Sequence, residues 1–351
     1  EDIEHYGRTC EAFTRLIPAE KRLNESILGF GTALTMTAAA ANPTTTAAEA
    51  GVARNVTGLP FIGGAHVVKE IPAGGRKRVY MKLPLSGIFT ANQKYLPCWS
   101  MGAGGVEVLL SLAPAADSFV HTVNGVAKSQ QYHLENIVLE CDMISIDSSL
   151  QDQYSRNLLD GGSLTLHTKL WDCTQVYLQP NNGGSFDVSL SKSLSRAATI
   201  FFNFSEELSE ATRQAGTMYV NTFLMYPAAA ETLESHVTVG SKRYPEFAVK
   251  GTTSHFWKLT QALGIAKSLP HSINVDQDSY NSNSFQMGTD LEACPLVAST
   301  GVNTTGGQEL ALHVKGFKSD NAGTNVPRRC WACIHYEAIV ELRATGAHLL
   351  T

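Results

Sequence analysis

Hydrophobic and polar residues alternate with a period of two through the middle of this chain, from residue 132 to residue 204. Leu164, Leu166 and Leu170 fall on one side of an extended segment, with polar residues between them. Residues 186–190 repeat the pattern. Such alternation predicts strands with one buried face and one face turned to solvent or to a neighbour. Several strands joined by turns rich in Gly, Asn and Ser predict an all-β sandwich rather than a βαβ fold.

The rest of the chain adds three helices and further strands. The clearest helix covers residues 2–17, where apolar residues recur at spacings of three and four. A short helix is predicted at residues 148–162 behind the cap Asp147, and another at residues 254–266 behind the cap Ser254. Strands are predicted near residues 76–84, 105–113, 134–146, 163–170, 173–178, 184–190, 197–204, 217–225, 308–316 and 330–345.

These elements divide into two β-units. The strand near residues 134–146 is apolar on both sides, as a central strand should be. Alternation begins anew at Ser163, directly after the short helix ends at two glycines. We therefore expect a first unit at residues 1–147, a linking helix at residues 148–162 and a second unit at residues 163–351.

Two stretches lack the composition of a packed core. Residues 32–54 are a low-complexity run rich in Ala and Thr, and residues 270–284 are polar. Both are predicted to be long exposed loops. The chain does not begin with Met and carries no recognisable signal peptide, so an N-terminal segment is expected to be missing or removed.

Composition narrows the class of protein. Of 351 residues, 43% are hydrophobic and 17% charged, which supports a sizeable core and a weakly charged surface of the kind that neighbours cover. The net charge of −5 gives no electrostatic case for binding nucleic acid, and the densest basic cluster, residues 76–78, opens a strand. No apolar run reaches the roughly 18–20 residues of a membrane span. Seven scattered cysteines fit reduced thiols better than a disulfide framework.

Motifs that carry chemistry are scarce. Cys330 and Cys333 form a CxxC pair, but in a strand two positions three apart point to opposite faces, so the sulfurs do not meet. His255, His313 and His335 are expected to have ordinary surface or interface roles, since no HExxH motif is present. We therefore predict no catalytic, cofactor-binding or metal-binding residues, and no enzyme activity.

Seven segments of the chain, in order, share a further resemblance. They read LIPAEKR at residues 16–22, YMKLPLSGIF and KYLP at residues 80–89 and 94–97, LECDMISIDSSL at residues 139–150, VGSKRYPEF at residues 239–247, TGVNT at residues 300–304 and IVELR at residues 339–343. Together they resemble double jelly-roll major capsid proteins of eukaryotic DNA viruses, the polinton-like and related lineages. The pattern departs from the family ahead of the 2–17 helix, where a complete first jelly roll needs strands.

The resemblance implies a structural protein of the virion, assembled inside the host cell. It implies two tandem eight-stranded jelly rolls and a homotrimer that forms a pseudo-hexameric capsomer of an icosahedral capsid. Its partners would then be two sister copies, neighbouring capsomers, and penton and minor capsid proteins. The family has no catalytic residues or cofactors, so none carries over.

Three other functions fit an all-β chain. One is a single-jelly-roll capsid subunit with a projecting domain. Another is a carbohydrate-binding or carbohydrate-active sandwich, which needs aromatic residues and paired carboxylates in one groove. The aromatic candidates for such a groove are Trp99, Trp171, Trp257 and Trp331. A cell-surface adhesin needs paired cysteines or a calcium loop, and no Asp-rich loop of that kind is present.

Overall fold

The computed structural model describes most of the second half of the chain. The described residues are 133–179, 184–205, 230–266, 285–292, 300–306, 308–318 and 327–350, with shorter pieces at 2–4, 96–100, 106–112, 122–123 and 126–127 and the single residues Thr9, Ala12, Phe13, Leu16, Arg76, Pro227 and Tyr280.

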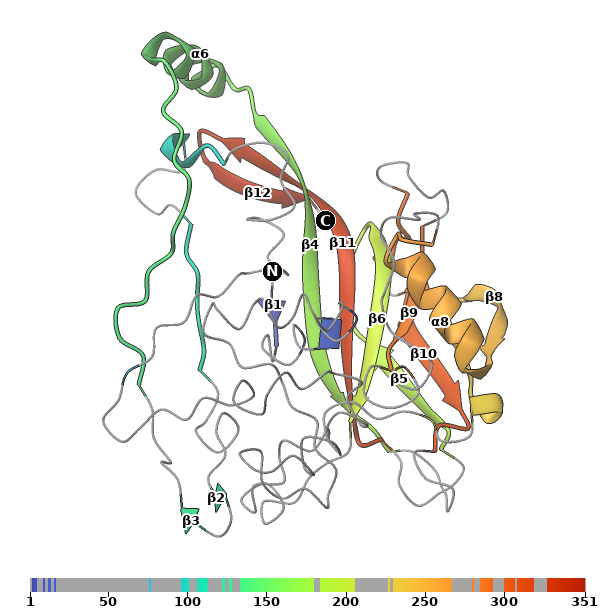
Figure 1. Ribbon diagram of the computed structural model, residues 1–351. Helices are drawn as coiled ribbons and strands as arrows, with labels where there is room; N and C mark the ends of the chain where they lie inside the picture. Colours follow the sequence, from blue (N-terminus) through green and yellow to red (C-terminus); the bar gives the residue numbers. More distant parts are fainter. Residues whose placement is uncertain are drawn as a thin grey trace.

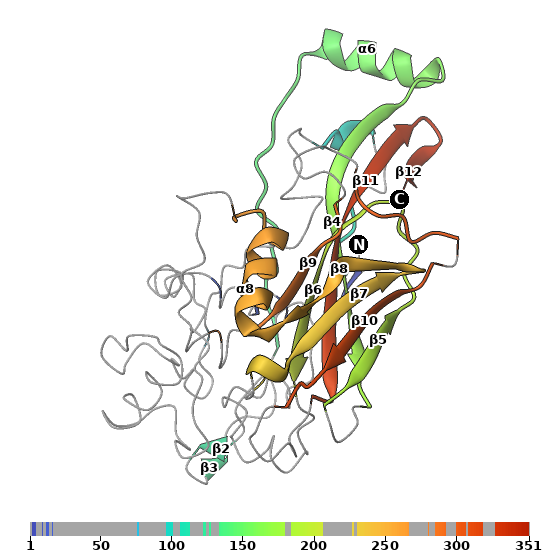
Figure 2. The same ribbon diagram turned by 90° about the vertical axis from the view of Figure 1, so that its right-hand side faces the viewer.

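Eight strands between residues 164 and 343 form two facing sheets (Figure 1). They are β4 (Leu164–Tyr177), β5 (Phe186–Leu190), β6 (Ala197–Ser205), β7 (Glu234–Val239), β8 (Lys242–Lys250), β9 (Met287–Asp290), β10 (Leu310–Lys315) and β11 (Arg329–Arg343). One sheet contains the order β4-β11-β6-β9, and the other has the order β5-β10-β7-β8. Figure 2 shows the four strands of the second sheet side by side.

The strand pairing defines a jelly roll. The first of the eight strands pairs with the last, the second with the seventh, the third with the sixth and the fourth with the fifth, all antiparallel. A long hairpin wrapped into two sheets produces this pairing, which is the jelly-roll arrangement. The all-β prediction is confirmed, and the residues predicted to form the second unit contain a complete eight-stranded jelly roll.

Smaller elements extend this framework. Strand β1 (Asp2–Ile3) pairs in parallel with β4, and β12 (Gly346–Leu350) pairs with the end of β11. The remaining elements are the hairpin β2 (Thr122–Val123) and β3 (Val126–Ala127), the 3-10 helices η2 (Cys98–Ser100) and η5 (Ala230–Thr232), and the helices α6 (Ser148–Leu159) and α8 (Gly251–Ala262). None of the described helices is long and apolar enough to cross a bilayer.

The core lies between the two sheets and continues across the outer face of the first. Every residue of β6 is buried, so both faces of this strand are covered. On one side the ring of Phe204 packs against Phe186 and Phe317, with centroids 5.6 and 4.9 Å apart. On the other side Phe13, from the N-terminal segment, packs edge-on against Phe201 at 5.1 Å. Phe13 thus covers part of the outer face of this sheet.

The N-terminal helix begins later than predicted. Asp2 and Ile3 are in a strand beside Asp172 and Cys173, whereas Thr9, Ala12 and Phe13 are helical. The prediction of a helix from residue 2 is therefore wrong at its start. The open edge of β4 offers backbone partners to Asp2 and Ile3, and this tertiary contact overrides their helical spacing.

Helix α8 also departs from its predicted start. The N-cap position is Lys250 rather than Ser254, so the helix begins at Gly251, directly after β8. Gly251 has a φ of 74°, which glycine adopts without the Cβ clash of other residues and which turns the strand straight into the helix. Helix α6 begins behind Asp147, as predicted, but it ends at Leu159 rather than residue 162, and the Asp147 side chain makes no capping hydrogen bond.

Several strand boundaries differ from prediction. The two strands predicted at residues 163–170 and 173–178 are the single strand β4, because β11 pairs with it along its whole length. Strands β7, β8 and β9 lie where no strand was predicted. The predicted strands at 76–84 and 217–225 and the loop at 32–54 lie outside the described residues, apart from Arg76, as does the loop at 270–284 apart from Tyr280.

Two predicted strands of the first unit are not strands. Residues 106–112 and 133–147 belong to no sheet, and their apolar side chains are exposed. A strand needs a neighbour for its backbone hydrogen bonds, and in the described part of the chain neither segment has one. The prediction of a buried central strand at residues 134–146 is therefore wrong for this structure.

Candidate functional site

The outer face of the second sheet carries a group of polar side chains that contact one another. Strands β5, β10 and β7 lie next to one another, with His313 directly opposite Asp187 on one side and His236 on the other. Alternation along β5 buries Phe186, Val188 and Leu190. The intervening Asp187 and Ser189 therefore point outward, as the sequence pattern predicted.

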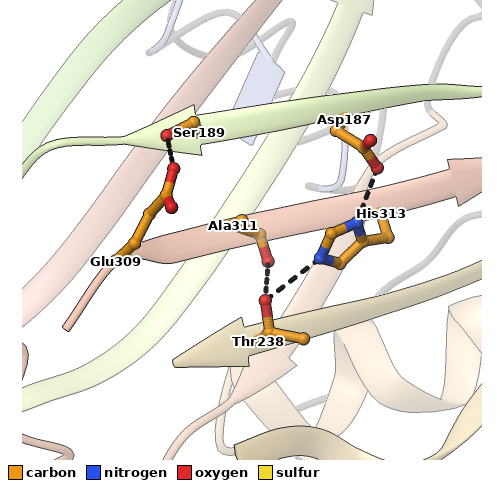
Figure 3. A network of polar contacts seen from close by, with 6 residues as sticks. All are labelled: Asp187, Ser189, Thr238, Glu309, Ala311 and His313. Atoms are coloured by element: carbon orange, nitrogen blue, oxygen red, sulfur yellow. Dashed lines mark hydrogen bonds and ion pairs between the residues drawn. The ribbon is translucent and has the colours of Figure 1, made fainter. Parts of the chain in front are cut away.

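Figure 3 shows how these side chains join three strands. Nδ1 of His313 donates to Oδ1 of Asp187 over 2.6 Å, and Nε2 of His313 lies 3.1 Å from the hydroxyl of Thr238. A second contact, between the hydroxyl of Ser189 and the carboxylate of Glu309, ties β5 to the residue before β10.

A second imidazole lies against this network. The ring of His236 stacks on the ring of His313, with centroids 4.8 Å apart and planes inclined by 24°. The pKa of His236 is lowered, first by burial and then by the positive charge of Arg243 and by His313, while Glu234 acts in the opposite sense. His236 therefore prefers to be neutral in this position.

The carboxylate, imidazole and hydroxyl occur in the order of a hydrolytic triad. Catalysis by such a triad also needs exclusion of water and donors for the developing oxyanion. The Asp187 side chain is 71% exposed, and the Thr238 hydroxyl also lies 3.5 Å from the carbonyl of Ala311. We therefore interpret the network as a set of cross-strand contacts that hold β5, β10 and β7 in register.

The cysteines of the CxxC pair lie in β11 and are buried, Cys333 directly opposite Cys173 of β4. Burial raises the pKa of the Cys330 thiol, which keeps it protonated and unreactive. Among the described residues no three His, Cys, Asp or Glu side chains are grouped as metal ligands. The structure thus places this motif in the core of the sheet.

The predicted surface role is wrong for His255, which is buried in α8. Its Nδ1 donates to the carbonyl of Gly251 over 2.6 Å, and its Nε2 lies 2.8 Å from the hydroxyl of Ser235 in β7. Burial lowers its pKa to about 4. The helical spacing of His255, Leu259 and Ala262 on one buried face is the sequence signal for this position.

His335 is half-buried in β11 and stacks on Trp171, with ring centroids 4.7 Å apart. Burial, and then the charge of Lys169, lowers its pKa to about 4. His335 and Trp171 lie on the same face of the sheet, because they are directly opposite one another on β11 and β4. The ring of His335 therefore serves packing in its neutral form.

The tryptophans are dispersed. Trp331 is buried, Trp257 is half exposed, and Trp99 packs near Tyr154 with ring centroids 6.1 Å apart. Trp171 packs against Phe13, Phe201 and His335. Among the described residues no two of the four tryptophans are in ring contact, so the aromatic groove expected of a carbohydrate-binding sandwich is not found there.

The second candidate surface is apolar and consists of the two segments at residues 106–112 and 133–147. In Figure 1 both run as extended traces outside the sheets, and the second leads into α6. Their large apolar side chains are mostly half exposed or more, including Leu109 at 90% and Met143 at 80%. A cluster of exposed apolar side chains of this size marks a surface that another surface covers.

Comparison with known proteins gives structural matches alone, since neither a protein-family model nor a curated relative matches this sequence. The capsid of the virus PBCV-1 matches 57% of this chain with 8% identity and a TM-score of 0.38. The major capsid protein of bacteriophage PM2 matches 50% with 11% identity and a TM-score of 0.27, and the Faustovirus major capsid protein matches 56% with 11% identity and a TM-score of 0.33.

The matches cover 54%, 45% and 36% of those proteins, so this chain spans about half the length of the first two and about a third of the last. The assignment of the jelly roll to this chain rests on its own strand pairing.

Proposed function

We propose that this protein is a structural subunit of an icosahedral virus capsid that acts by self-association. The observation that carries the proposal is a complete jelly roll flanked by exposed apolar segments. Jelly rolls of this topology are a recurrent building unit of virus capsids. The sequence resemblance to double jelly-roll major capsid proteins supports the same function, whereas structural matches at TM-scores below 0.4 add no weight.

The proposed assembly is a homotrimer in which residues 1–147 belong to a first jelly roll beside the second, although in the single copy the described segments 106–112 and 133–147 pair with no described strand. In support, α6 ends five residues before β4, the first strand of the described jelly roll, and stands beyond the end of the sandwich (Figure 2). A linker between two units would occupy such a position. Neighbouring capsomers, pentons and minor capsid proteins are the further partners in this proposal.

The exposed apolar residues supply a driving force for association. Each square ångström of apolar surface removed from water contributes about 25 cal/mol. Ile137 is 70% and Val138 74% exposed, so both faces of this segment present apolar side chains. Three copies arranged around an axis can bury such segments in repeated contacts that close into a ring.

Light scattering coupled to gel filtration tests self-association, and electron microscopy of the assembly tests its form. The wild-type protein is expected to have the mass of a trimer or a larger assembly, and the double variant Ile137→Ser, Val138→Ser to shift toward monomer. Phe247→Ser is the matched control, because Phe247 is equally apolar and 81% exposed but lies on β8.

A well-behaved wild-type monomer at micromolar concentration would contradict the proposal. If Phe247→Ser loses assembly and the double variant does not, the protein still self-associates, but the contact lies on the sandwich rather than on the segment at residues 133–147. Two jelly rolls per copy in the images would support the double jelly-roll class. One jelly roll with a projecting domain would support the alternative capsid class.

A further inference from the structure

Of the two stacked histidines on the second sheet, His313 has an acidic partner among the described residues and His236 does not. His313 donates to the carboxylate of Asp187 over 2.6 Å, so its positive charge, when present, lies beside an acid. His236 has no hydrogen bond from its ring to another described residue. The acid nearest to it on its own strand, Glu234, pairs with Lys250 at 3.6 Å.

The remaining charges around His236 are positive. Arg243 of β8 and Lys315 of β10 both disfavour its protonated form, as does His313. The charged and titratable groups around the stacked pair are therefore Asp187 from β5, which contacts His313, and Lys315 from β10, Glu234 from β7 and Arg243 from β8, which act on His236. A second imidazolium at stacking distance from the first would add a cation to a site with few counter-charges.

We propose that the His236–His313 pair is an acid-sensitive contact between β7 and β10, closed while His236 is neutral and loosened when both rings are protonated. The two strands are the central pair of the sheet β5-β10-β7-β8, so a loosened contact exposes backbone amides in the middle of that sheet. The inference concerns the sandwich alone and does not depend on the capsid function.

The direction with pH follows from the lowered pKa of His236. A histidine whose folded pKa lies below its unfolded value of 6.5 stabilises the fold above that pH. This contribution is lost as the pH falls through the folded pKa. The other two histidines with lowered pKa, His255 and His335, titrate near 4 and stay largely neutral above about pH 5.5.

Hydrogen exchange with mass spectrometry on the whole protein tests the contact at about pH 7.5 and about pH 5.5. After correction for the pH dependence of intrinsic exchange, peptides covering β7 and β10 of the wild type are expected to exchange several-fold faster at the lower pH. Peptides from β4, which lies in the other sheet, serve as the internal control and should not change.

His236→Phe keeps an aromatic ring on His313 and removes the titrating group, so its β7 and β10 peptides should exchange equally at both pH values. His236→Gln is the second variant, should Phe at this position impair folding. Acid-accelerated exchange that persists in both variants, or a wild type whose exchange does not change, would overturn the inference. Either result leaves the oligomeric state, and with it the proposed function, to its own test.

Discussion

Strand β6 and the segment at residues 133–147 have similarly apolar sequences and opposite environments. Every residue of β6 is buried, whereas every residue of 133–147 is exposed. The difference lies in their neighbours: β6 pairs with β11 on one side and β9 on the other. The exposed segment has no strand partner within the described ranges. An apolar pattern thus indicates that the side chains of a segment favour burial. Whether they are buried depends on whether the segment has a strand to pair with.

The largest expected effect comes from truncating a large apolar side chain of β6, compared with a truncation in the other exposed segment, residues 106–112. Phe204→Ala should destabilise the sandwich by about 3–5 kcal/mol, because Phe204 is fully buried between Phe186 and Phe317. Leu109→Ala, at a position 90% exposed in the single copy, should change the stability of the dissociated monomer by less than about 0.5 kcal/mol. Urea denaturation followed by tryptophan fluorescence, to which buried Trp331 contributes, measures both variants. Equal losses would mean that residue 109 is covered in solution.

A smaller effect is expected at acid pH, where protonation of His255 should lower the free energy of unfolding by about 3 kcal/mol. Its folded pKa of about 4 lies below the ordinary 6.5, so its stabilising contribution is complete above pH 6.5 and is lost as the pH falls through about 4. The variant His255→Gln should lack this share of the pH dependence. Ser235→Ala removes the hydroxyl partner but keeps the titrating ring, so its pH dependence should persist. Denaturation series between these pH values make the comparison.

The regular part of the jelly roll could be predicted from the sequence. The strands predicted at residues 184–190, 197–204, 308–316 and 330–345 correspond closely to β5, β6, β10 and β11. Each of these has long runs of apolar or alternating residues. Strand β8 was not predicted because it is mostly exposed and contains Pro245. Strand β9 was not predicted because it has only four residues, one of them Gly288.

The polar network could not be predicted, because it depends on register between distant segments. His313 and Asp187 are 126 positions apart in the chain, and His313 and Thr238 are 75 apart. The alternation in the sequence predicted that Asp187 and His313 point outward, toward solvent. It could not predict that the two residues lie opposite one another on neighbouring strands. The buried state of His255 was missed for a related reason, since its partner Ser235 lies in a strand that the pattern did not reveal.

The smallest expected effect compares one substitution at two glycines with the same backbone requirement. Gly184, beside the sandwich core, has a φ of 68°, and Gly161, which follows α6, has a φ of 86°. A Cβ at Gly184 would lie 2.2 Å from the carbonyl oxygen of Phe317, whereas a Cβ at Gly161 would meet nothing within 4 Å. Gly161→Ala should therefore cost only the left-handed strain, about 1 kcal/mol.

Gly184→Ala should cost about 2–3 kcal/mol, because the backbone of Phe317 must also move away. That movement strains the hydrogen bond that the Phe317 amide donates to the Gly184 carbonyl over 3.0 Å. Thermal unfolding of the two variants beside the wild type gives the difference. Since the strain is shared, any excess at Gly184 measures how tightly the sandwich closes at this turn. Equal losses at the two sites would indicate that the turn yields, and that the packed region is less rigid there than its buried neighbours imply.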